Sequence, residues 1–128
     1  RVSKTIAAMK KFDCLYVHLK GPDLPAHDGE FDRKKKSIED IDKYYFGPLL
    51  KKVNLKETLI LVTADHSTPC INNAHSADPV PIVIAGNNVG PDSVGRFNEH
   101  DCANGSLGDL KGLDVMPKIM KIFNENRI

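Results

Sequence analysis

The middle of the chain carries an Asp-His pair at the end of an apolar run. Residues 59–64 are mostly aliphatic or β-branched, and Asp65 and His66 follow them directly. Two adjacent ionisable side chains at the end of a buried strand are costly unless something pairs them. Carboxylate and imidazole are both metal ligands, so this pair predicts one part of a metal site.

Two further polar segments carry the same chemistry. Asp23 and His27 stand four residues apart around Pro25, in a segment expected to be a loop, and His75 lies in a later loop of small and polar residues. Each segment alone also fits a structural role, because Asp and His side chains cap helices and turns and a loop histidine is commonly solvated. We expect the fold to bring the three segments together around metal.

The combined donor set indicates which metals would suit the site. Two carboxylates and three imidazoles match Mn²⁺, Zn²⁺ or Co²⁺ better than the oxygen shells that Ca²⁺ and Mg²⁺ prefer. Five ligands exceed one tetrahedral site but fall short of two complete sites. Further ligands are therefore expected from sequence outside this chain. Paired metals serve phosphoryl transfer by clamping the attacking and leaving oxygens.

Length, charge and cysteine content narrow the class of protein. The 128 residues suit one domain, and the formal net charge of +1 argues against nucleic acid or an anionic membrane as a partner. Three cysteines without CxxC spacing indicate reduced thiols and a cytoplasmic enzyme domain. The chain starts at Arg1 within a helical pattern, which suggests a fragment of a longer protein. Nothing in the sequence indicates the oligomeric state.

The hydrophobic pattern predicts the elements that must position these residues. The basic run 33–36 is expected to be the solvated face of a helix. We expect helices at 3–11, 31–52 (divided near residue 46 by Gly47-Pro48) and 113–123, and strands at 12–19, 59–64, 80–86 and, within a long loop, 94–97. This alternation predicts an α/β fold with a largely parallel sheet flanked by helices. Ligands bind beyond the C-terminal strand edges of such sheets, where residues 20–29 and the Asp65-His66 pair would lie.

Several motifs together carry a family resemblance. They are Val17-His18-Leu19-Lys20-Gly21-Pro22-Asp23, His27-Asp28-Gly29, Thr63-Ala64-Asp65-His66-Ser67-Thr68-Pro69-Cys70 and His75-Ser76-Ala77-Asp78-Pro79-Val80-Pro81, followed by Arg96-Phe97-Asn98-Glu99 and Met116-Pro117. In this order they closely resemble the archaeal-type branch of cofactor-independent phosphoglycerate mutase, in the alkaline phosphatase superfamily. The resemblance covers nearly the whole chain.

The resemblance implies an enzyme that interconverts 3-phosphoglycerate and 2-phosphoglycerate through a phosphoserine. It also implies two divalent metals, with Mn²⁺ as the first choice and Zn²⁺, Co²⁺ or Mg²⁺ as alternatives. Asp23, His27 and His75 would hold one metal, and Asp65 and His66 the other. The nucleophilic serine and an inserted substrate domain have no counterpart here. Residues 1–128 would therefore be the C-terminal part of an alkaline phosphatase-like domain, inactive alone.

Alternatives remain open for the substrate and for one residue. The chain could belong to another metal-dependent phosphomutase or phosphatase of the same superfamily, or form a non-catalytic metal-binding module. Lys20, beside Asp23, is a candidate contact for the substrate phosphate, although a solvated lysine explains it equally well.

Overall fold

The computed structural model describes residues 1–125, which divide into two compact units. Unit 1 contains residues 1–53 and 67–77, and unit 2 contains residues 54–66 and the chain from residue 78 onward. The chain thus leaves unit 1, builds part of unit 2 and returns. No helix within residues 1–125 combines the length and the apolar character needed to cross a membrane.

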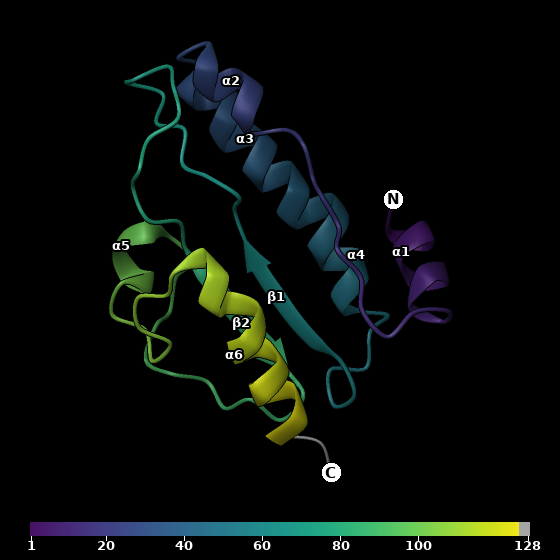
Figure 1. The fold of residues 1–128 in the computed structure, drawn as a ribbon. Coiled ribbons are helices and arrows are strands. Elements are labelled where there is room, and N and C mark those ends of the chain that lie inside the picture. Colours follow the sequence, from purple (N-terminus) through teal and green to yellow (C-terminus); the bar gives the residue numbers. More distant parts are fainter. Residues whose placement is uncertain (126–128) are drawn as a thin grey trace. The chain divides into compact units, whose positions relative to one another are not determined.

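Unit 1 is built on one long helical stretch (Figure 1). Helix α3 (Phe31–Ile41) continues into a π-helical turn, η1 (Asp42–Phe46), and then into α4 (Gly47–Leu50). In η1 the N–H of Gly47 donates to the carbonyl of Asp42, five residues earlier. Pro48 has no N–H to donate, and a π turn is one way to change the hydrogen-bond register beside it. The predicted division near residue 46 is confirmed.

Two short helices pack on this stretch. Helix α1 (Val2–Met9) contacts α4, and the Thr5 hydroxyl lies 2.9 Å from the Tyr45 hydroxyl. Helix α2 (Asp23–His27) packs on α3. Apolar burial in this unit is concentrated at Ala26, Tyr45 and Leu49, which are 0%, 7% and 6% exposed. The core of unit 1 therefore lies among its helices.

The expected strand at residues 12–19 is wrong. This stretch has no regular secondary structure, and Phe12 and Tyr16 are 63% and 86% exposed. A strand needs a neighbour to complete its hydrogen bonds, and the described part of the chain pairs no strand with this stretch. Apolar composition predicted a buried strand, but composition does not supply the neighbour.

Unit 2 contains a two-stranded antiparallel sheet. Strands β1 (Leu59–Thr63) and β2 (Ile82–Gly86) confirm the strands expected at 59–64 and 80–86, and they pair with Leu59 opposite Gly86 and Thr63 opposite Ile82. The pairing differs from the expected largely parallel sheet. Within residues 1–125 both paired strands run antiparallel, and no parallel neighbour is assigned.

The remainder of unit 2 is helical or irregular. Helix α5 (Glu99–Cys102) follows Asn98, whose side chain caps it by accepting the N–H of Asp101 at 2.9 Å. The strand predicted at 94–97 is wrong, because these residues have no regular secondary structure. Helix α6 (Gly112–Glu125) agrees with the predicted C-terminal helix. The buried Asn87 links the loop after β2 to α6 by donating to the carbonyl of Phe123 at 3.1 Å.

Candidate metal centre

Helix α2 places the first two candidate ligands on one face. Asp23 and His27 are four residues apart, which is the spacing that makes side chains neighbours on a helix. His27 Nε2 lies 3.5 Å from Asp23 Oδ1. The segment was expected to be a loop, but it is helical. Its Pro25 occupies the first helical turn, where a missing N–H breaks no hydrogen bond.

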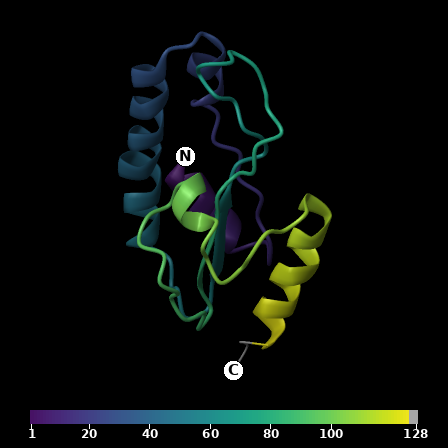
Figure 2. The same ribbon diagram turned by 90° about the vertical axis from the view of Figure 1, so that its left-hand side faces the viewer.

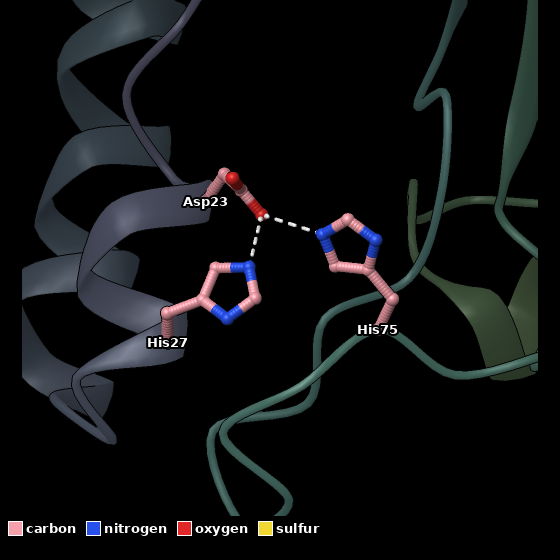
Figure 3. Close-up of side chains that lie close together, drawn as sticks. All are labelled: Asp23, His27 and His75. Carbon is pink, nitrogen blue, oxygen red and sulfur yellow. Dashed lines mark ion pairs between the residues drawn. The ribbon is translucent and has the colours of Figure 1, made fainter.

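The loop of residues 67–76 brings the third candidate ligand to the same oxygen. His75 Nε2 lies 3.7 Å from Asp23 Oδ1, and the rings of His27 and His75 have centroids 5.0 Å apart (Figure 3). One ligand atom from each of Asp23, His27 and His75 lies within 4.8 Å of the others. Two imidazoles therefore converge on one carboxylate oxygen. Figure 2 shows the loop returning beside α2.

Backbone contacts fix the shape of this loop, here called the 67–76 loop. Ser67 and Ser76 form an isolated antiparallel bridge, and the N–H of Ser76 donates to the carbonyl of Ser67 at 3.0 Å. Asn73, near the middle of the loop, has a φ of 50°. Asparagine tolerates this left-handed region better than most residues. The bridge closes the loop immediately beside His75.

The same loop also contacts the second ring nitrogen of His27. His27 Nδ1 lies 3.1 Å from the carbonyl oxygen of Asn73. A carbonyl only accepts hydrogen bonds, so Nδ1 carries the proton and donates. The lone pair of a neutral His27 then lies on Nε2, the atom that faces Asp23 and His75.

A glycine permits the close approach between α2 and the 67–76 loop. Gly29 has a φ of +71°, and a Cβ on it would lie 3.1 Å from Asn73 Oδ1. Any other residue at this position would press against Asn73 in a strained backbone conformation. The glycine after α2 therefore helps to bring Asn73 within reach of His27.

Sequence reasoning missed two residues that support Asp23. The Thr68 hydroxyl donates to Asp23 Oδ1 at 3.0 Å, and Thr68 is 5% exposed. Lys34 on α3 donates from Nζ to the carbonyl oxygen of Thr68 at 2.7 Å. The expectation that residues 33–36 form only a solvated face is therefore wrong for Lys34, which is half-buried. Lys34 is less exposed than its neighbours because it contacts a loop far away in the sequence. Helical periodicity does not predict such a contact.

Of the other predicted site residues, Asp65 and Lys20 are exposed and His66 is half-buried. Asp65 and His66 follow β1 in unit 2, where the His66 N–H donates to Asp65 Oδ1 at 3.2 Å and His66 Nε2 lies 3.7 Å from Asp65 Oδ2. The expected position at the end of a strand is confirmed. Lys20 precedes α2 and is exposed, and its proposed contact with phosphate stays a prediction.

Comparison with known proteins shows strong similarity along the chain. A protein of Methanoculleus marisnigri named 2,3-bisphosphoglycerate-independent phosphoglycerate mutase is 45% identical over 126 residues, which are 98% of this chain and 30% of that protein. One of the same name from Aeropyrum pernix is 42% identical over 94% of this chain and 29% of its own length. The chain thus spans about 30% of these curated relatives.

Solved structures and family models give a concordant result. A structure of a protein from Pyrococcus horikoshii superposes with a TM-score of 0.92 at 37% identity, covering 99% of this chain and 38% of that one. The model of the metalloenzyme superfamily matches residues 1–122. The chain, with its carboxylate and two imidazoles gathered at one point, therefore belongs to the metalloenzyme superfamily.

Proposed function

We propose that the complete protein containing this chain interconverts 3-phosphoglycerate and 2-phosphoglycerate, a step of glycolysis and gluconeogenesis. The observation that carries the proposal is the convergence of Asp23, His27 and His75 in a chain similar over nearly its whole length to proteins named phosphoglycerate mutase. The reaction would pass through a phosphoserine. Its nucleophilic serine would lie outside this chain, which covers less than a third of those relatives.

The geometry of the three side chains supports a first metal between them. Metal–nitrogen and metal–oxygen bonds of about 2 Å place neighbouring ligand atoms roughly 3 to 3.5 Å apart in a tetrahedral shell. The distances of 3.5 and 3.7 Å to Asp23 Oδ1 are slightly larger, so small side-chain rotations would bring the three ligand atoms to coordinating positions. All three side chains are partly exposed, which leaves room for further ligands.

Asp65 and His66 would serve a second metal, with the remaining ligands supplied from outside the chain. Their support is their position after β1 and their mixed oxygen and nitrogen chemistry. This donor set favours Mn²⁺, with Zn²⁺, Co²⁺ or Mg²⁺ as alternatives. We propose a cytoplasmic location, where such a substrate is metabolised.

The chain's own residues would organise the reacting groups and would not attack the substrate. Two metals, when bound, would supply Lewis acidity that lowers the pKa of a serine hydroxyl and neutralises phosphoryl oxygens. The described side chains would hold the ions in fixed positions, and Lys20 would bind a phosphate oxygen. We further propose that residues 1–128 are the C-terminal part of an alkaline phosphatase-like domain whose additional strands make the sheet largely parallel.

The test is a calorimetric titration of the chain with Mn²⁺ at neutral pH, comparing wild type with His75→Ala. We expect the variant to lose specific binding, because it retains only two of the three ligands. His100→Ala is the matched control, since His100 is 92% exposed and pairs with Asp101 at 3.2 Å. Equal Mn²⁺ affinity in wild type and His75→Ala would contradict the proposed centre.

The substrate is tested separately on the complete protein. We expect turnover of phosphoglycerates and none of pentose phosphates, and the reverse preference would favour another phosphomutase of the same superfamily. Metal binding without turnover of either class would favour a non-catalytic module.

A further inference from the structure

The side chain of Thr68 bridges the 67–76 loop and the carboxylate of the candidate metal centre. Its hydroxyl donates at 3.0 Å to Asp23 Oδ1, the same oxygen that faces Nε2 of His27 and of His75. A carboxylate oxygen has two lone-pair directions, so it can accept a hydroxyl and still offer a lone pair to a cation. The hydrogen bond therefore selects an orientation of Asp23 without blocking its ligand atom.

The burial of Thr68 makes this contact persistent. The residue is 5% exposed, so water does not readily replace the carboxylate as the acceptor of its hydroxyl. A buried hydroxyl left without a partner is destabilising, which favours keeping the carboxylate as its acceptor. Asp23 itself is 54% exposed at the side chain, so burial alone does not fix its orientation.

The backbone of Thr68 is held as well as its side chain. Lys34 Nζ donates to its carbonyl oxygen at 2.7 Å, and Lys34 belongs to helix α3. The long helix thus fixes the loop residue, and the loop residue fixes the carboxylate. Arg33 and Lys36, on the same helix, instead form ion pairs with Glu30 and Asp40 close by in the sequence.

We propose that Thr68 is a positioning residue for the metal centre, with Lys34 anchoring it. This inference rests on the proposed function, because it assumes that Asp23 is a ligand. Residues that hydrogen-bond to metal ligands typically contribute 10- to 100-fold to metal affinity by fixing the orientation of the ligand. The loop would thereby orient two ligands, Asp23 through the Thr68 hydroxyl and His27 through the Asn73 carbonyl, and supply a third, His75.

The test compares Mn²⁺ affinities of Thr68→Val and Thr68→Ser with that of the wild-type chain by calorimetry. Valine keeps the branched shape but removes the hydroxyl, so we expect the dissociation constant to rise 10- to 100-fold. Serine keeps the hydroxyl and should bind within about threefold of wild type. Thr5→Val is the matched control, since it removes a hydroxyl contact to Tyr45 elsewhere in unit 1.

Two measurements separate positioning from a general loss of structure. Far-ultraviolet circular dichroism and thermal unfolding without metal show whether Thr68→Val is folded. The visible spectrum of bound Co²⁺ reports coordination geometry and should change in Thr68→Val but not in Thr5→Val.

The anchoring role of Lys34 is tested in the same way. Lys34→Met should weaken Mn²⁺ binding less than Thr68→Val does, whereas Lys36→Met should leave Mn²⁺ binding unchanged.

The outcomes distinguish this inference from the proposed function. If Asp23→Ala loses Mn²⁺ binding while Thr68→Val retains wild-type affinity and Co²⁺ spectrum, the positioning role is overturned and the metal centre stands. If Asp23→Ala binds Mn²⁺ as tightly as wild type, the metal centre itself is overturned, and the role of Thr68 with it. A weakened Thr68→Val that serine restores supports both.

Discussion

Asp92 organises a loop of unit 2 with a single carboxylate. It accepts the N–H of Ser106 at 2.8 Å, the Ser106 hydroxyl at 3.1 Å and the N–H of Val94 at 2.9 Å. The Ser106 N–H, followed by the Val94 N–H, holds the pKa of Asp92 below its ordinary value, because these donors stabilise the charged form. This carboxylate therefore favours the folded loop when ionised.

The stability of this loop should depend on pH. A lowered pKa contributes stability that is fully present above the unfolded pKa of about 3.9 and is lost as the pH falls through the lower folded pKa. We expect Asp92→Asn to destabilise the chain at neutral pH, with a difference from wild type that shrinks in acid. Denaturant unfolding between about pH 3 and pH 7 measures this. Asp109→Asn removes the same charge at an exposed site and should show no such trend.

Single residues of the candidate site differ in how far the sequence predicts them. Asp23, His27 and His75 could be named as candidate ligands from the sequence, because carboxylates and imidazoles are common metal ligands. Thr68 was not, because threonine has many roles and its partner lies 45 residues away along the chain. The α-helical arrangement of Asp23 and His27 could have been inferred from their four-residue spacing.

At the scale of elements, the end of β2 requires a glycine at position 86. Its φ is +93°, and a Cβ there would lie 2.1 Å from the carbonyl oxygen of Thr58 and 3.0 Å from that of Leu55. We expect Gly86→Ala to destabilise the chain by more than about 1 kcal/mol, since both the backbone conformation and the contact are unfavourable.

Thermal or denaturant unfolding of the variant measures this effect. Gly90→Ala is the control, because a Cβ on Gly90 meets nothing within 4 Å. If the two alanine variants are equally stable, the contact between Gly86 and the backbone of Thr58 is absent in solution.

Local pattern predicted individual elements better than their pairing. The apolar runs at β1 and β2 and the helix division at Gly47-Pro48 follow from properties of neighbouring residues, and all three are confirmed. The antiparallel pairing of β1 and β2 could not be predicted, because strand direction depends on the path of the chain between them. The strand predicted at 12–19 was wrong for a related reason, because a strand forms only where a second strand lies beside it.

At the scale of the whole molecule, many apolar side chains stay on the surface. Leu113, Met116 and Met120 of α6 are 92%, 55% and 49% exposed. Ile71, in the 67–76 loop, is 91% exposed. Such side chains favour self-association of the chain at high concentration.

The 128-residue chain is expected to show no phosphoglycerate mutase turnover, even with Mn²⁺ bound. The reason is that the proposed nucleophilic serine would lie outside it. Conversion of 3-phosphoglycerate, followed by phosphorus NMR, measures this, with the complete protein as the positive control. If the chain alone turns over substrate, and Ser67→Ala or Ser76→Ala abolishes that turnover, the nucleophile lies within the chain. This result would contradict the assignment of roles.

The candidate metal centre joins two parts of unit 1 that are far apart in the sequence. The chain leaves this unit after Val53 and returns at Ser67, so His75 approaches α2 only after a long excursion. An ion shared by His27 and His75 would act as a reversible cross-link that closes a loop of roughly 50 residues, which in chain-entropy terms resembles a disulfide of about 4 kcal/mol. The ion would then stabilise the fold as well as take part in the reaction. Removing it with a chelator would free residues 67–77 from their attachment to α2.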